Sequence, residues 1–196
     1  MPEHGKRLVT DESGITLIEL LVYIVLLGAV MSIVVNLFTT SVRTEARIRS
    51  VSSDVESAQL ISDSLVSGVR NSSGYKLSLP FGADQLLVAR VANTQGDTVT
   101  WECRGWYYAA GNKTIRTAVM ASPYTPPTWE PPSWTLLGTG VTPTSGNGNT
   151  VFTTTTTAAG QQFAFSFQYA TAGNTPVGIA NAVVSRAGPS GSPTCY

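Results

Sequence analysis

Hydrophobic residues are spread unevenly along the chain, and the longest apolar run lies near its start. Residues 15–35 read ITLIELLVYIVLLGAVMSIVV, in which only Thr16, Glu19 and Ser32 are clearly polar. At 1.5 Å per residue these 21 positions give about 31 Å of helix, close to the roughly 30 Å thickness of a bilayer's hydrocarbon core. The run therefore predicts a helix that spans a membrane.

The helix is expected to continue beyond this run. There is no proline in residues 3–79 and no glycine in residues 29–67, so one helix over about 15–67 is the simplest interpretation. Apolar residues then recur at three- and four-residue steps at Ile48, Val51, Val55, Ala58, Leu65 and Val69, with Ser62 filling one turn. Polar residues lie largely between them, at Arg47, Arg49, Asp54, Glu56 and Asp63. This spacing predicts an amphipathic second half whose apolar stripe packs on a sheet.

From residue 71 onward, turn residues separate short apolar or alternating runs, which predicts a β-rich head. The candidate strands are Gln85–Val91, Thr98–Ala109, Lys113–Met120, Gln161–Thr171 and Val177–Ala187. Gly111 and Asn112 suit a hairpin turn between the second and third of them. In the fourth, the aromatic residues Phe163, Phe165, Phe167 and Tyr169 occupy every second position, as in a half-buried strand. The predicted fold class is α+β, with a long N-terminal helix packed on an antiparallel β-sheet.

Residues 122–160 are dense in proline, threonine, glycine and serine, and we expect them to be mostly loop or extended edge. Trp129 and Trp134 stand among these prolines. They could form an exposed adhesive or partner surface, or pack back onto the sheet, and packing is the favoured interpretation. Residues 188–196 (GPSGSPTCY) are expected to be a flexible tail.

The charge pattern argues against nucleic-acid binding. Twelve basic residues are balanced by twelve acidic ones, whereas nucleic-acid modules carry a clustered excess of Lys and Arg. Arg43, Arg47 and Arg49 are interleaved with Glu45 and Glu56, which favours a solvated or subunit-contacting helix face. DNA binding is therefore not indicated.

The sequence offers little for catalysis, metals or cofactors. His4 is the only histidine, so His-based triads and His-rich metal sites are absent from the rest of the chain. There is no phosphate-binding GxxxxGK and no GxGxxG. Ser73 and Lys76 match the short pattern SxxK of some serine acyltransferases, but without the accompanying motifs and in an expected helix-to-sheet loop. We predict no enzyme, no cofactor and no metal site.

The start of the apolar run carries a more specific signal. A short polar leader ends in Gly14, the apolar run begins at Ile15, and a carboxylate follows at Glu19. The segment SGITLIELLVYIVLLGAV resembles the processing and methylation signal of type IV prepilins and pseudopilins. The resemblance implies cleavage between Gly14 and Ile15 by a membrane aspartyl peptidase, followed by N-methylation of Ile15. Three features depart from the usual pattern: Ile15 in place of phenylalanine, the acidic residues Asp11 and Glu12, and Asn36 in place of a helix-bending proline.

The same resemblance implies an organisation and a set of partners. Residues 1–14 would be a cytoplasmic leader, 15–36 a transmembrane and assembly helix, 37–69 its amphipathic continuation, and 70–196 an extracytoplasmic head. The partners would be the prepilin peptidase and N-methyltransferase, other pilin subunits, an assembly platform with its ATPase, and membrane lipid. The precursor would be a single-pass protein of the cytoplasmic membrane, and the assembled subunit would lie in a pilus or pseudopilus outside it.

Glu19 has a physical interpretation in either setting. Inside a packed helical bundle its carboxylate would be desolvated and would need a cationic partner, for which the amine of Ile15 on a neighbouring subunit is the candidate. Such a pair would set the axial register of a docking subunit, the role that the resemblance implies for this glutamate. The alternative is a first-turn carboxylate favoured by the helix dipole.

The two cysteines and one hairpin complete the prediction. A bond between Cys103 and Cys195 is favoured because disulfides persist outside the cytoplasm, with two unrelated free thiols as the alternative. The segment WECRGWYYAAGNKTIRTAV resembles a hairpin in the heads of minor pilins and larger pseudopilins, which favours a minor or tip subunit. The rival function is a single-pass anchored, adhesin-like binding protein that does not polymerise.

Overall fold

The computed structural model describes residues 14, 16–95, 98–120, 124–127, 129–145, 148–157, 160–171, 173–186 and 194–196. The expected leader, apart from Gly14, and the residue Ile15 lie outside this description, as does most of the expected tail. The chain divides into two units, residues 1–46 and residues 47–196, and each is described by itself.

One helix, α1 (Leu17–Arg70), runs through the boundary between the two units without a break. The expectation of a single long helix is confirmed, with an end three residues later than expected. The helix is continuous through Asn36, whose side-chain amide donates to the carbonyl of Ser32 at 2.9 Å. At the other end the amide of Asn71 donates to the carbonyl of Ser67 at 3.1 Å and closes the last turn.

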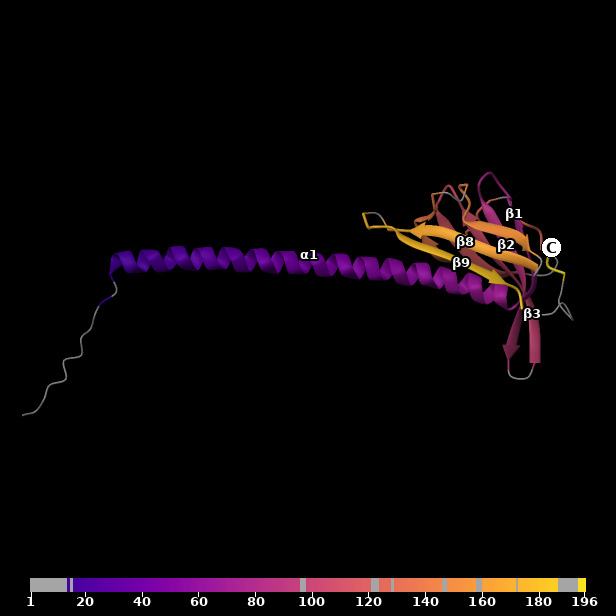
Figure 1. Ribbon diagram of the computed structural model, residues 1–196, viewed down its shortest axis with the longest axis horizontal. Coiled ribbons are helices and arrows are strands. Elements are labelled where there is room, and N and C mark those ends of the chain that lie inside the picture. The colour runs from indigo at the N-terminus through magenta and orange to yellow at the C-terminus, as the bar shows by residue number, and fades with distance from the viewer. Residues whose placement is uncertain are drawn as a thin grey trace, which may run out of the picture. The chain divides into compact units, whose positions relative to one another are not determined.

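Five strands of the second unit form an antiparallel meander, which we call sheet A (Figure 1). Its strands, in spatial order, are β1 (Ser72–Ser78), β2 (Gln85–Gln95), β3 (Thr98–Ala109), β4 (Thr114–Met120) and β5 (Thr135–Thr139). Strand β3 has the bounds that the sequence predicted, and β2 is four residues longer than expected. Each strand pairs with its sequence neighbour, so short connections build the whole sheet.

The remaining four strands form sheet B, whose centre is β8 (Gly160–Tyr169). Strand β9 (Val177–Val184) pairs along one edge of β8, and the two lie side by side in Figure 1. Strands β6 (Val141–Pro143) and β7 (Phe152–Thr157) share the opposite edge. All three pairings are antiparallel.

The main core lies between the last turns of α1, one face of sheet A and one face of sheet B. The alternating aromatics of β8 all point into it, which confirms the predicted period of two. Their rings contact one another in series, with centroids 5.9 Å apart for Phe163–Phe165 and 6.1 Å apart for Phe165–Phe167. The predicted α+β arrangement, a long helix packed on antiparallel sheet, is therefore confirmed.

The buried face of α1 differs from the predicted stripe. Its buried residues are Asp54, Ala58, Ile61, Leu65, Gly68 and Val69. Ile61 takes the place that was expected for Ser62, and Ile48 is 64% exposed. The face is fixed by Gly68, which lies against the indole of Trp106, while Ser64 accepts a hydrogen bond from Trp106 Nε1 at 2.9 Å. The close contact of Gly68 with Trp106 lies on this buried face, and the spacing of hydrophobic residues did not predict it.

The other face of sheet A carries a smaller outer cluster. Its buried members are Leu86, Val88, Cys103, Tyr107, Ala109 and Cys195. Tyr124 and Trp134, from the segment that follows β4, cover this cluster. Both faces of sheet A are thus covered, one by α1 and sheet B and the other by irregular chain.

One prediction about irregular structure needs correction. Ser73 and Lys76, expected in a loop between helix and sheet, lie on the edge strand β1. The stretch 122–160, expected to be mostly loop or extended edge, contains the short strands β5, β6 and β7, each at an edge of its sheet. These segments form strands because a neighbour pairs with them: Thr153–Thr156 lie opposite Gln161–Ala164 of β8. Their own sequences alternate too weakly to signal this.

Candidate functional site

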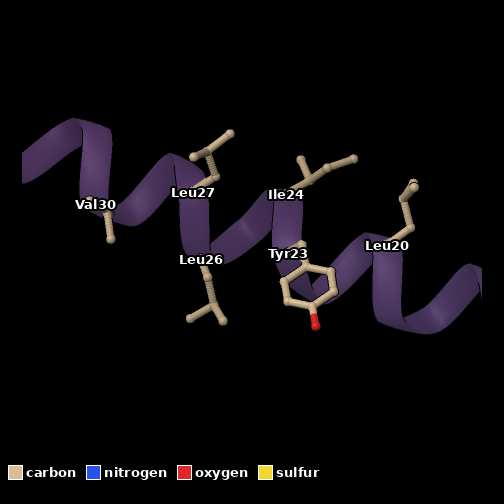
Figure 2. Close-up of a pocket in the computed structure, with 6 residues that line it drawn as sticks. All are labelled: Leu20, Tyr23, Ile24, Leu26, Leu27 and Val30. Carbon is tan, nitrogen blue, oxygen red and sulfur yellow. The ribbon is translucent and has the colours of Figure 1, made fainter. Parts of the chain in front are cut away.

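The first unit presents an apolar helix surface, made by Leu20, Tyr23, Ile24, Leu26, Leu27 and Val30 (Figure 2). These side chains are 53–61% exposed. Figure 2 shows Leu20, Ile24 and Leu27 on one side of the helix and Tyr23, Leu26 and Val30 on the other. A helix that is apolar all round needs an apolar environment on every side, either lipid or other helices.

No described residue of the first unit covers this surface. The buried positions of α1 begin only at Asp54, in the second unit. Within the described residues, α1 is the one helix that is long and apolar enough to cross a membrane. The described residues of the first unit therefore leave this surface uncovered, and it calls for an apolar environment.

The first turn of α1 holds Glu19 in a defined local geometry. Thr16 precedes the helix, and its hydroxyl accepts a hydrogen bond from the amide of Glu19 at 3.4 Å. Tyr23, one turn later, donates its hydroxyl to Glu19 Oε1 at 3.3 Å. Thr16 and Glu19 have the T-x-x-E spacing of a helix capping box. Sequence analysis missed both Thr16 and Tyr23, although that spacing was visible in the sequence.

Of the two residues at the expected cleavage junction, the structure describes only Gly14. A Cβ atom added to Gly14 would meet no heavy atom within 4 Å. Among the described residues, nothing therefore crowds the backbone at Gly14. Cleavage and methylation themselves stay predictions.

In the second unit, Asp54 fastens α1 to the connection between β8 and β9. Asp54 is 2% exposed, and it accepts hydrogen bonds from Thr171 Oγ1 at 2.7 Å and from Asn174 Nδ2 at 2.7 Å. Asn174 also donates to Ser50. Burial by itself raises the pKa of Asp54, but the hydrogen bonds from Asn174 and Thr171 outweigh this, and the pKa lies below its ordinary value of 3.8. Asp54 was expected between the apolar positions, and it is instead a buried polar contact.

Glu130 has a similar role for the segment that crosses the outer cluster. Its Oε1 accepts hydrogen bonds from Arg116 Nε and Thr114 Oγ1, each at 2.6 Å, and its Oε2 accepts one from Asn112 Nδ2. Burial by itself raises the pKa of Glu130. The three hydrogen bonds and the charge of Arg116 outweigh this effect, so the pKa of Glu130 lies below its ordinary value. The carboxylate therefore ties the chain around residue 130 to β4 and to the turn before it.

The favoured disulfide is present. Cys103 of β3 and Cys195 are bonded, with Cα atoms 5.6 Å apart and a sequence separation of 92. Cys195 is buried in the outer cluster, so the short described segment 194–196 is anchored to sheet A. Tyr196 then lies with its ring centroid 5.3 Å from Arg90 Cζ and accepts a hydrogen bond from Arg90 Nη2 at 3.3 Å.

The two tryptophans of the proline-rich stretch behave differently. Trp134 packs on the outer cluster, where a Cβ atom at Gly105 would lie 2.6 Å from its Cη2. Trp129 is 70% exposed. The expectation of packing is therefore right for Trp134 and wrong for Trp129.

Ser73 and Lys76, the SxxK pair, have different surroundings. Both residues lie on strand β1, not in a loop. Lys76 Nζ lies over the ring of Tyr196, 5.9 Å from its centroid, whereas the Ser73 hydroxyl is buried without a partner among the described residues. No group of three or more possible metal ligands occurs within the described part of the chain.

Comparison with known proteins adds one match. The family described as the prokaryotic N-terminal methylation motif matches residues 10–35, and this is the type IV prepilin-like signal. No curated protein and no solved structure matches the chain. The motif and the apolar helix that begins within it at Leu17 fit a type IV pilin-like subunit, in which the helix serves as a membrane anchor for the precursor.

Proposed function

We propose that this chain is a structural subunit of a type IV pilus or pseudopilus, cleaved after Gly14, methylated on Ile15 and assembled through its apolar helix. The main support for the proposal is that two features occur in the same segment. The methylation motif covers residues 10–35, and the same stretch contains the helix surface that is apolar on every side. A signal for processing and a surface that needs helical neighbours are thus in one segment.

In this proposal each of four segments of the chain has its own role. Residues 1–14 are the cytoplasmic leader, 15–36 the membrane and assembly helix, 37–69 its continuation, and 70–196 the extracytoplasmic head. The chain is a substrate of the prepilin peptidase and methyltransferase. An assembly platform with its ATPase then extracts it from the membrane and adds it to the filament. Chemistry is done on this protein, and it does none itself. A minor or tip position is favoured by the elaborate head, with nine strands in its described part and a disulfide.

Glu19 sets the register of assembly in this proposal. In a lone helix its carboxylate accepts a hydrogen bond from the Tyr23 hydroxyl, while its backbone amide donates to the Thr16 hydroxyl. When lipid or other helices surround it, the charge requires a cation, and the methylated amine of Ile15 on a neighbouring subunit supplies one. A subunit with the wrong axial offset would leave both charges unpaired.

The test combines processing with incorporation. Intact-mass and peptide mass spectrometry of the membrane-associated protein should find a chain that begins at Ile15 and is heavier by one methyl group. Glu19→Ala should reach the membrane in normal amount but fall at least tenfold in sheared filaments. Tyr23→Phe is the matched control, because it removes only the intrahelical partner of Glu19, and it should be incorporated normally.

Two results would contradict the proposal. A membrane protein that retains residues 1–14 in cells with an active prepilin peptidase would rule out processing. Incorporation of Glu19→Ala at the normal level would rule out the register role.

A non-polymerising anchored binding protein is the second candidate. The observation in its favour is that the Tyr23 hydroxyl donates to Glu19 within one helix, so the carboxylate has a hydrogen-bond partner without a neighbouring subunit. Under this alternative, the protein would be absent from filaments, and Glu19→Ala would leave its display on the membrane and any binding by the head unchanged.

A further inference from the structure

A hollow of about 670 Å³ opens on the head where three segments of chain meet. The first segment is the turn after β1, which contributes Phe81 and Asp84. The second is the turn between β3 and β4, which contributes Asn112. The third is the segment Trp129–Pro132. None of these residues takes part in the helix surface or in the disulfide.

Two aromatic side chains line the hollow and are largely open to water. Trp129 is 70% exposed and Phe81 is 69% exposed. By contrast, large aromatic side chains on the strands of sheet A, such as Trp106 and Tyr107, are fully buried. Single exposed apolar residues are ordinary, but two large aromatics on one hollow form a surface that a ligand can use.

The polar groups of the hollow are held in fixed positions. Glu130 is fixed by three donors, as described above, and Asp84 accepts hydrogen bonds from Tyr107 Oη at 2.7 Å and from the amide of Ala110 at 2.8 Å. Arg116 donates from Nε to Glu130 and from Nη1 to the carbonyl of Trp134. Within the described part of the chain, Arg116 Nη2 and the side-chain oxygen of Asn112 make no hydrogen bond, so both residues that line the hollow keep some hydrogen-bonding capacity. Planar polar groups are therefore oriented before any ligand arrives.

The charges limit the kind of ligand. The hollow has two carboxylates, Asp84 and Glu130, and one guanidinium, Arg116. A polyanion such as nucleic acid would meet this carboxylate excess. An alkyl chain would desolvate the ionised groups without replacing their hydrogen bonds to water. A ligand that matches has apolar C–H faces and many neutral hydroxyl groups.

From this geometry we propose that the hollow binds a neutral carbohydrate. One sugar ring stacks its C–H face on the indole of Trp129, with Phe81 as a second contact. Its hydroxyl groups pair with Asn112 and Arg116. The proposal holds whether or not the chain polymerises, because every contact comes from the head of one subunit.

The test uses the full chain in detergent micelles. A panel of immobilised neutral oligosaccharides based on glucose, galactose and N-acetylglucosamine serves as the probe, and binding is followed by surface plasmon resonance. We expect at least one of them to bind, and Trp129→Ala to weaken that binding at least tenfold. Phe81→Ala should weaken it severalfold. Tyr196→Ala is the matched control, since it removes a part-exposed aromatic side chain that does not line the hollow, and it should leave binding unchanged.

Three outcomes would overturn the proposal. The first is that no oligosaccharide of the panel binds the wild-type chain, and the second is that binding survives Trp129→Ala unchanged. The third concerns a different occupant, another subunit. If a photo-crosslinker at position 129 in assembled filaments captures a neighbouring subunit, the aromatics serve protein contact and not sugar binding.

Discussion

Gly68 offers the sharpest test of how α1 is seated on the head. Glycine in a helix interior ordinarily costs about 1 kcal/mol relative to alanine, so Gly68→Ala should stabilise the helix by that amount if nothing else changed. However, a Cβ atom at this position would fall well inside van der Waals contact with Cη2 and Cζ2 of Trp106. The indole is fully buried and cannot move away freely.

The magnitude follows from three contributions to the free energy of unfolding. Overpacking of a tight core costs about 1–3 kcal/mol. A displaced indole also loses its 2.9 Å hydrogen bond to Ser64, which contributes about 1 kcal/mol. Subtracting the helix gain of about 1 kcal/mol leaves a net destabilisation of about 1–3 kcal/mol. For a unit of this size, that lowers the melting temperature by roughly 2–12 °C.

The assay is thermal unfolding of the full chain in detergent, followed by near-ultraviolet circular dichroism of the head. Gly28→Ala is the control, because it makes the same change in the same helix where a Cβ atom meets nothing within 4 Å. This control should leave the melting temperature of the head unchanged. A rise in melting temperature for Gly68→Ala would refute the packing argument, because helix propensity would then have outweighed the contact with Trp106.

Two further predictions concern the head. Asp54→Asn should lower stability at pH 7 by about 1–3 kcal/mol, through lost charge-assisted hydrogen bonds. Because the folded pKa of Asp54 lies below its ordinary value of 3.8, its contribution is complete above that value and is lost as the pH falls further. Urea titrations should therefore show the difference between wild type and variant narrowing below about pH 4, and a difference independent of pH would contradict this. Replacing both cysteines with alanine should cost about 2–4 kcal/mol by the same assay, with the 92-residue separation setting an upper figure near 4–5; an unchanged midpoint would contradict it.

Local patterns predicted the elements whose own sequence carries the signal. The apolar run, the absence of helix breakers and the alternating aromatics of β8 each specify a conformation without reference to other parts of the chain. The turn at Gly111 and Asn112 likewise predicted the hairpin of β3 and β4. These features depend on neighbours within one turn or one strand.

What the sequence did not reveal depends on distant partners. Asp54 reads as a solvent-facing carboxylate until Thr171 and Asn174, 117 and 120 positions later, supply its donors. The same holds for β1, whose edge position comes from pairing with β2. Trp129 and Trp134 are five positions apart in similar sequence, and Trp134 is packed because it lies against Gly105 on β3 and the outer cluster. No local pattern contains that information.

The long span of the disulfide also has a consequence for the order of events in time. Strands β2, β3 and β4 lie within residues 85–120, so the sheet around Cys103 can form early. Its partner is made 92 positions later, which at about 5–20 residues per second is a delay of roughly 5–20 seconds. During this interval Cys103 is a thiol, and an oxidant that acts early meets only one cysteine of the head. The oxidised bond therefore reports that the residues from Cys103 to Cys195 have been made and that Cys195 has reached sheet A.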